Sequence, residues 1–241
     1  MLLEICASSY PSAINAETAG AHRIELCSEL AVGGITPSYG LLKKVCANLN
    51  IPVCVLIRPR SGDFTYTAAE FEIMKENIQL CKELGCAGIV SGVLHKDFTI
   101  DIERTQELVE LSKPMTFTFH RGFDWTPNPK EAIKKLASIA IDRVLTSGQA
   151  AAAKKGIPLL KELQEIAGND LIVMPGGGIN PENASLFKES GFQEIHCSAT
   201  SLQESIDEPK ISMNSHKFLS DIHIATSDTK KIKQILASIQ S

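Results

Sequence analysis

Acidic and thiol side chains alternate along two short apolar runs near the start of the chain. Glu4 and Cys6 lie two residues apart in the first run, and Glu25 and Cys27 repeat that spacing in the second. Successive side chains of a β-strand point to opposite faces, so the two members of each pair share a face. Carboxylates and thiols gathered on one face are suited to proton transfer or to binding of a metal ion.

Basic side chains end two later apolar runs. Arg58 and Arg60 close the third run, and His120 closes the fifth. A charged group inside a protein is costly unless it is paired, so we expect Glu4, Glu25, Arg58 and His120 to form one mutually compensating cluster. That cluster is either a pocket, in which Glu25, His120 and Arg58 would be the catalytic residues, or a structural layer of salt bridges.

A glycine-rich loop follows the seventh apolar run. It contains three consecutive glycines, and Asn180 and Pro181 then fit the N-cap and first turn of a helix. Backbone N–H groups of such a loop suit a phosphate or carboxylate, although a tight turn that needs positive φ angles would have the same composition. We expect the anion-binding residues to be Arg58, Arg60, Ser147, Gly176, Gly177 and Gly178.

The elements that would position these residues alternate between strand and helix. Helical stretches separate the apolar runs at the spacing of strand-plus-helix units. The strands are expected to begin near Leu2, Arg23, Pro52, Gly88, Met115, Asp142, Leu171 and Glu194. Eight such units predict an α/β protein with one (β/α)8 TIM barrel domain over residues 1–241. An open doubly wound sheet is the alternative, but the first turn after a strand has no G-x-G-x-x-G motif.

The end of the chain departs from this alternation. Residues 201–226 predict an irregular excursion, in which Ile222 to Ile224 alternate like a short strand. A closing helix follows, with Ser227 or Asp228 as its N-cap. Such an excursion would cover the barrel mouth, contact a partner subunit or form a surface loop.

Composition places the chain among cytoplasmic globular proteins. Apolar residues make up 44% of its 241 residues, and its net charge of −4 favours neither nucleic acid nor an anionic membrane as a partner. No apolar run reaches the roughly 18 residues of a membrane span, and the N-terminus does not resemble a signal peptide. Seven cysteines without framework spacing are expected to be thiols in a reducing compartment.

Several of these motifs, in the same order, resemble the CutC family, which is named for copper homeostasis. They are residues 3–6, 23–28, 33–38, 57–64, 118–124, 143–148 and 174–178. The resemblance implies a (β/α)8 barrel, a cytoplasmic location, a homodimer and copper handling through cysteine thiolates. This sequence departs from the family pattern at Ser61, Gly122 and Ser91, and the tail beyond about residue 200 matches no motif.

Two functions remain open on the sequence. In the first, the protein binds Cu(I) through Cys6 and Cys27, which are expected at matching levels of adjacent strands about 4.8 Å apart, with His120 or His196 as a third ligand. Packing is the alternative role of those two thiols, as it is for the remaining cysteines. In the second, the protein is a lyase-like or isomerase-like enzyme acting on a small phosphorylated or carboxylated metabolite.

Overall fold

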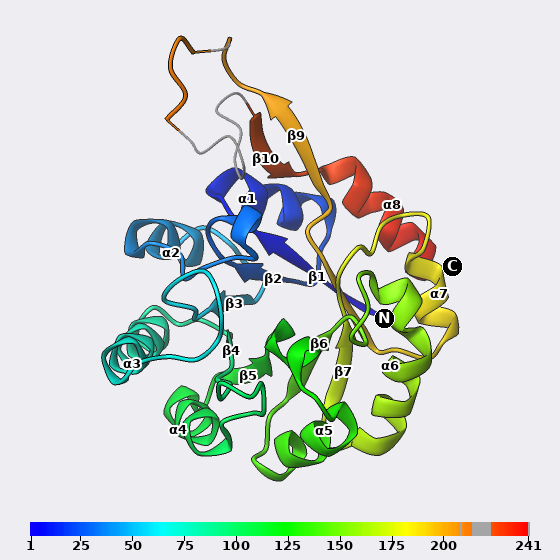
Figure 1. Ribbon diagram of the computed structural model, residues 1–241. Helices are drawn as coiled ribbons and strands as arrows, with labels where there is room; N and C mark the ends of the chain where they lie inside the picture. The colour runs from blue at the N-terminus through cyan, green and yellow to red at the C-terminus, as the bar shows by residue number, and fades with distance from the viewer. Residues whose placement is uncertain (208, 214–222, 241) are drawn as a thin grey trace.

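A barrel of eight parallel strands forms the centre of the computed structural model, and helices surround it (Figure 1). The structure describes residues 1–207, 209–213 and 223–240. The barrel strands are β1 (Leu2–Ala7), β2 (Arg23–Leu26), β3 (Val53–Leu56), β4 (Gly88–Ser91), β5 (Thr116–Phe119), β6 (Arg143–Thr146), β7 (Ile172–Pro175) and β8 (Glu194–Cys197). Their order is β7-β6-β5-β4-β3-β2-β1-β8, and a parallel bridge between Gly176 and His196 links its two ends. The predicted (β/α)8 fold is confirmed.

Alternation along β1 shows why these runs become barrel strands. Leu3 and Ile5 are fully buried in the main apolar core, which the strands share with the helices. Glu4 and Cys6 point the other way, toward the barrel interior, where Glu4 meets residues of β2 and β8. One face of the strand therefore packs against the helices, and the other face carries the polar side chains of the barrel interior.

A helix follows each barrel strand and returns the chain to the other end of the barrel, except that two further strands separate β8 from the last helix. In α3 a capping box fixes the first turn, because Thr67 accepts from the backbone N–H of Glu70 and Glu70 accepts from that of Thr67. The helices are α1 (Tyr10–Ala19), α2 (Tyr39–Cys46), α3 (Ala68–Glu83), α4 (Ile102–Ser112), α5 (Pro129–Ser138), α6 (Ala153–Ala167), α7 (Ala184–Glu189) and α8 (Thr229–Gln240), with short 3-10 helices at Leu30–Val32 and Arg121–Trp125.

The helix after the glycine-rich loop begins later than its sequence predicts. Asn183, not Asn180, is the N-cap of α7, so the expected helix start at Pro181 is wrong. The side chain of Asn183 accepts from the Asn180 N–H at 2.9 Å and donates to the Gly178 carbonyl at 2.9 Å. These bonds close a turn between the loop and the helix. The loop therefore does not lead directly into a helix N-terminus.

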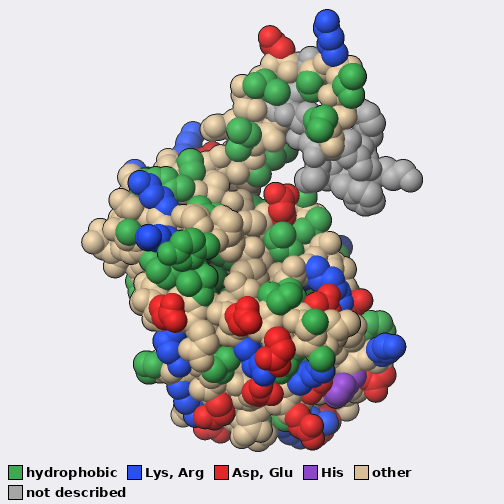
Figure 2. Space-filling model, turned by 90° about the vertical axis from the view of Figure 1, so that its left-hand side faces the viewer, with side chains coloured by type: hydrophobic (Ala, Val, Ile, Leu, Met, Phe, Trp, Pro, Cys, Tyr) green, Lys and Arg blue, Asp and Glu red, His purple; other side chains and the backbone are tan. Residues whose placement is uncertain are grey.

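A two-stranded antiparallel sheet projects from the barrel after β8 (Figure 1), and hydrophobic side chains are exposed on this projection (Figure 2). Its strands are β9 (Thr200–Glu204) and β10 (His223–Ser227), so part of the predicted irregular excursion is regular. The expected short strand corresponds to β10, although Ile222 lies outside the described residues. Leu202 and Ile224 are among its exposed apolar side chains.

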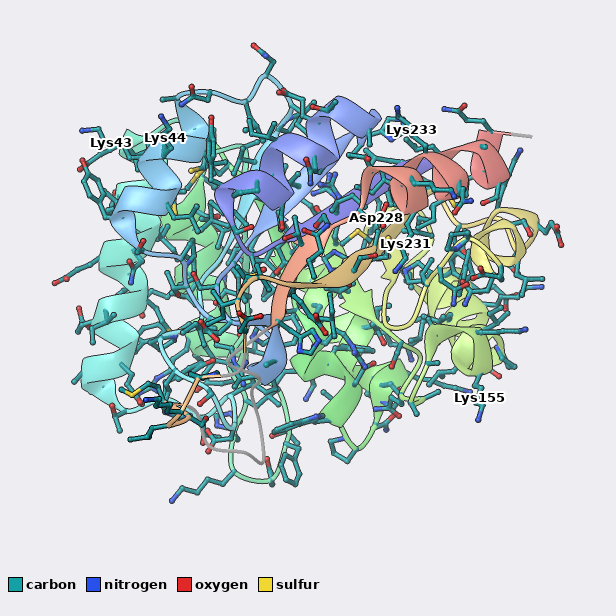
Figure 3. All side chains as sticks on the ribbon, turned by 90° about the horizontal axis from the view of Figure 1, so that it is seen from above. Lys43, Lys44, Lys155, Asp228, Lys231 and Lys233 are labelled. Atoms are coloured by element: carbon teal, nitrogen blue, oxygen red, sulfur yellow. The ribbon has the colours of Figure 1, made fainter. Side chains whose placement is uncertain are left out.

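Asp228 connects this sheet to the last helix. Its side chain accepts from the backbone N–H groups of Lys230 at 2.8 Å and Lys231 at 3.2 Å, as the N-cap prediction requires (Figure 3). The helix α8 then packs against α1 and α7. Within the described part of the chain, no helix combines the length and apolar character needed to cross a bilayer.

Candidate functional site

Two thiols meet where the carboxyl ends of β1 and β2 lie side by side. The Sγ atoms of Cys6 and Cys27 are 3.6 Å apart, within the range of a thiol–thiol hydrogen bond. The strand register pairs Cys6 with Glu25 rather than with Cys27, so the two cysteines are not at the matching levels that we expected. Their side chains nevertheless converge, because Cys27 follows the end of β2 and shares the interior face with Glu25.

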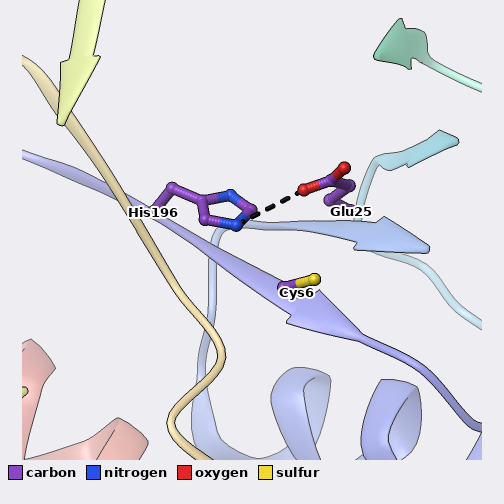
Figure 4. A group of neighbouring side chains, drawn as sticks. All are labelled: Cys6, Glu25 and His196. Carbon is purple, nitrogen blue, oxygen red and sulfur yellow. Dashed lines mark ion pairs between the residues drawn. The ribbon is translucent and has the colours of Figure 1, made fainter. Parts of the chain in front are cut away.

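An imidazole and a carboxylate complete a group around Cys6 (Figure 4). The Nε2 atom of His196 on β8 lies 3.3 Å from Oε2 of Glu25. One ligand atom from each of Cys6, Glu25 and His196 lies within 4.8 Å of the others. Three neighbouring strands thus place a soft sulfur donor, a nitrogen donor and an oxygen donor around one point.

Glu4 holds the imidazole of this group in place from a position deeper in the barrel. Its carboxylate accepts a hydrogen bond from Arg23 and lies 2.9 Å from Nδ1 of His196. Arg23 also donates to Glu194 at 2.6 Å, and Arg143 donates to the same Glu194 oxygen at 2.8 Å. The inward charges that compensate Glu4 are therefore Arg23 and His196, rather than the Arg58 and His120 that the sequence suggested.

Burial and neighbouring charges move the pKa values of this cluster apart. Burial acts to raise the pKa of Glu4, but the hydrogen bond from His196 and the charge of Arg23 outweigh it and lower that pKa to about 2. Burial dominates at Glu25 and raises its pKa to about 7. For His196, the hydrogen bond to Glu4 and the charges of Glu25 and Glu4 outweigh burial and raise the pKa. Two glutamates only one strand apart thus differ in charge near neutral pH.

The thiol of Cys6 is held in its protonated form. Its hydrogen bond with Cys27, then burial and the charge of Glu25, raise its pKa well above the usual value. A thiolate here therefore needs a cation to replace the proton. Cys27 packs with Cys54, Leu56 and Val90 in a small apolar cluster beside this point.

Arg58 lines the cavity, and its guanidinium also donates hydrogen bonds to backbone carbonyls. Its guanidinium donates to the carbonyls of Val32 and Gly34, each at 2.8 Å, and to that of Gly62 at 2.6 Å. Arg60 lies on the surface instead, where it pairs with Glu70 at 2.6 Å and with Asp63 at 3.1 Å. Arg58 lines the mouth cavity described below, whereas Arg60 does not.

His120 lies at the opposite side of the same mouth as a neutral imidazole. Burial lowers its pKa to about 3, and its Nδ1 accepts from the Gly122 N–H at 3.2 Å. The neutral tautomer therefore carries its proton on Nε2. Within the described part of the chain, this buried Nε2 has no hydrogen-bond partner. His120 thus holds a buried N–H donor beside the cavity that it lines.

The glycine-rich loop faces a basic side chain that was not among the predicted site residues. A Cβ atom on Gly177 would stand 3.2 Å from Nη1 of Arg121 and 3.4 Å from the Cβ of Ser147. Arg121 is in turn fixed by Asp124 at 2.8 Å and donates to the Ser147 hydroxyl at 3.1 Å. Of the residues predicted to bind an anion, Gly177 and Ser147 therefore lie beside this arginine. Gly176 bridges to His196, and Gly178 lines a separate groove against α8.

A cavity of about 110 Å³ joins these groups at the mouth. The thiol, carboxylate, imidazole and guanidinium side chains named above surround it together with apolar walls. Its lining residues are Cys6, Glu25, Gly33, Leu56, Arg58, Phe64, His120, Arg121, Leu145 and His196. Sequence reasoning missed Arg23, Arg143 and Arg121, although Arg23 shares the strand parity of Glu25 and carried the same signal.

Fold and site together define a (β/α)8 barrel protein with buried thiol, carboxylate and imidazole groups at its mouth. The chain belongs to the CutC family, whose model matches residues 1–201. It is 42% identical over 240 residues to the human "copper homeostasis protein cutC homolog", covering 98% of this chain and 88% of that protein. A CutC family protein of Chromobacterium violaceum is 47% identical and covers 82% of this chain and 81% of its own length.

A solved structure of the same family agrees with this assignment, and a second structure shares the fold. A crystal structure described as the putative copper homeostasis protein CutC from Streptococcus agalactiae has a TM-score of 0.78 and 34% identity, covering 82% of this chain and 98% of that one. Phosphoribosyl anthranilate isomerase from Thermus thermophilus has a TM-score of 0.58 at 12% identity, covering 100% and 98% of the two chains. The second likeness shows the barrel fold alone.

Proposed function

We propose that this chain takes part in copper homeostasis by binding Cu(I) between Cys6 and Cys27. The observation that carries the proposal is the 3.6 Å separation of the two Sγ atoms inside the barrel mouth. Soft thiolate ligands favour Cu(I) over hard cations, and the bound ion would replace thiol protons. In this role the ion is cargo rather than a resident cofactor.

Among the two histidines that we considered as third ligand, the geometry favours His196. A ligand nitrogen of His196 lies within 4.8 Å of the Cys6 sulfur and of a Glu25 oxygen. Its other nitrogen is held by Glu4, which orients the ring as a supporting carboxylate does for metal-binding histidines.

Anaerobic Cu(I) titration against a chromogenic Cu(I) chelator tests this proposal. We expect the Cys6→Ser, Cys27→Ser variant to lose one tightly bound equivalent, and His196→Gln to weaken that equivalent by about 10–100-fold. Cys54→Ser removes a neighbouring buried sulfur from the same apolar cluster and should bind as the wild type does. Unchanged stoichiometry and affinity in the Cys6→Ser, Cys27→Ser variant would contradict the proposal.

The buried Nε2 of His120, which has no partner among the described residues, favours a second function, that of an enzyme for a small carboxylated or phosphorylated metabolite. The Nε2–H would donate to a substrate oxygen, while Arg58 and Arg121 supply positive charge around the same cavity. In this function the anion would bind at the predicted end of the barrel, but Arg121 rather than Arg60 would supply positive charge beside Arg58.

Thermal unfolding of copper-free protein with a panel of small carboxylates and phosphates tests the second function. A ligand at about 100 times its Kd should stabilise the wild type by about 2.7 kcal/mol. His120→Phe keeps an aromatic ring but removes the donor, and it should lose that stabilisation, whereas Arg60→Met should keep it. Equal stabilisation of the His120→Phe variant would exclude the role of Nε2. The cytoplasmic location and homodimer stay predictions, to be measured by fractionation and sedimentation.

A further inference from the structure

A second pair of thiols lies at the opposite end of the barrel. The Sγ atoms of Cys46 and Cys86 are 3.6 Å apart, the same separation as that of the mouth pair. Cys46 is the last residue of α2, and Cys86 stands two residues before β4 begins. Because helices of this fold end where strands begin, the pair is on the face away from the mouth.

A defined turn places Cys86 in this position. Gly85 ends α3 with a φ of +74°, its N–H donates to the Lys82 carbonyl at 3.1 Å, and the Cys86 N–H donates to the Cys81 carbonyl at 3.0 Å. These two bonds form a Schellman motif, which brings the residue after the glycine back against the helix. The turn thus places the Cys86 thiol next to that of Cys46, where α2 and α3 end.

The surroundings of this pair disfavour a free thiolate. Helices α2 and α3 both end here, and the carbonyls of their last turns carry partial negative charge, which Lys43, Lys44 and Lys82 of the same turns partly offset. The hydrogen bond with Cys86, and then burial, raise the pKa of Cys46. The hydrogen bond with Cys46 lowers the pKa of Cys86, but Cys81 and burial outweigh it and raise that pKa to about 12.

These conditions argue against a reactive cysteine, which needs a lowered pKa. A metal ion bound here would have to displace both protons, so the case for a site rests on the 3.6 Å separation of the two sulfur atoms. Cys86 is buried whereas Cys46 is only partly so, which leaves one sulfur open to approach from the surface. The ammonium groups of Lys43 and Lys44 lie over the rings of Tyr39 and Tyr10, at 5.6 Å and 5.5 Å from the ring centroids.

We infer that Cys46 and Cys86 form a second site for a soft monovalent cation of the Cu(I) type. Metal–thiolate bonds of about 2.3 Å to both sulfurs would give an S–metal–S angle of roughly 100° at the observed separation. Binding would form two metal–sulfur bonds and release one proton from each thiol to solvent. The site shares no residue with the mouth, so the inference goes beyond the proposed function.

Anaerobic Cu(I) titration of four full-length proteins tests the inference. The wild type should bind two equivalents, and both the Cys6→Ser, Cys27→Ser variant and the Cys46→Ser, Cys86→Ser variant should bind one. The variant with all four substitutions should bind none. As a matched control, Cys197→Ser changes a buried cysteine outside both pairs and should keep two equivalents. Circular dichroism establishes that each variant is folded. Where a serine variant is not folded, alanine replaces serine at the same positions, for example Cys46→Ala, Cys86→Ala.

The two sites fail in distinguishable ways. The second site is overturned if the Cys6→Ser, Cys27→Ser variant binds no Cu(I). It is also overturned if the variant with all four substitutions still binds one equivalent. If instead the Cys6→Ser, Cys27→Ser variant keeps one equivalent and the Cys46→Ser, Cys86→Ser variant binds none, the mouth proposal fails and the second site stands.

Discussion

Replacing Arg23 by methionine should destabilise the protein by about 3–5 kcal/mol at pH 7. Arg23 is the shared partner of Glu4 and Glu194, and all three are buried. The substitution keeps an unbranched side chain but removes the guanidinium that both buried carboxylates share. Urea unfolding at pH 7 measures the loss.

Arg60→Met is the matched control for this effect. Arg60 pairs with Glu70 at the same 2.6 Å as Arg23 with Glu194, but its pair lies at the surface, where such a change costs about 1 kcal/mol or less. Adding Glu4→Gln and Glu194→Gln to Arg23→Met should recover much of the lost stability by removing the buried charges. A loss below about 1 kcal/mol for Arg23→Met would show that the cluster is not held by this arginine.

Glu25→Gln should act in the opposite direction and stabilise the protein at pH 8. Burial raises the pKa of Glu25 from 4.5 to about 7, so the unfolded chain loses this proton before the folded one does. Stability therefore falls as pH rises from 4.5 to about 7, and the full penalty, about 3 kcal/mol, is present above that range. Glutamine carries no charge and avoids the penalty.

Unfolding of both proteins at pH 5 and pH 8 measures this difference. The variant should gain stability at pH 8 and show little difference at pH 5. Glu4→Gln is the comparison, because the pKa of Glu4 is lowered to about 2. Its stabilising effect is present above the ordinary pKa of 4.5 and is lost as pH falls toward 2, so Glu4→Gln should be destabilising at both pH values. A Glu25→Gln variant that is less stable at pH 8 would contradict the account of this carboxyl.

The sheet was predictable because its information is local. Short β-branched and apolar runs between helical stretches located all eight strands, and the parity rule placed Glu4 and Cys6 on one face. Helix ends were harder, since Asn183 takes the N-cap of α7 by bonding to Asn180 and Gly178. The strand β9 was not predicted, because its polar sequence forms a strand only by pairing with β10.

The sequence predicted which side chains face the barrel interior, but not which partners the long side chains contact. Strand parity brought Cys6, Glu25 and Cys27 to the interior, as the structure shows. Arg58 is long enough to fold back onto carbonyls that the sequence places 24 and 26 residues away, and nothing local signals this. The thiols of Cys46 and Cys86 meet only because two helices end at one place, so their spacing of 40 residues carried no signal.

Crystals of the Cys46→Ser, Cys86→Ser variant loaded anaerobically with Cu(I) give the most direct test of copper binding at the mouth. An anomalous difference map at the copper edge should show one peak between the sulfur atoms of Cys6 and Cys27, on the side of His196. A map without a peak there, from protein that still binds copper in solution, would contradict the account.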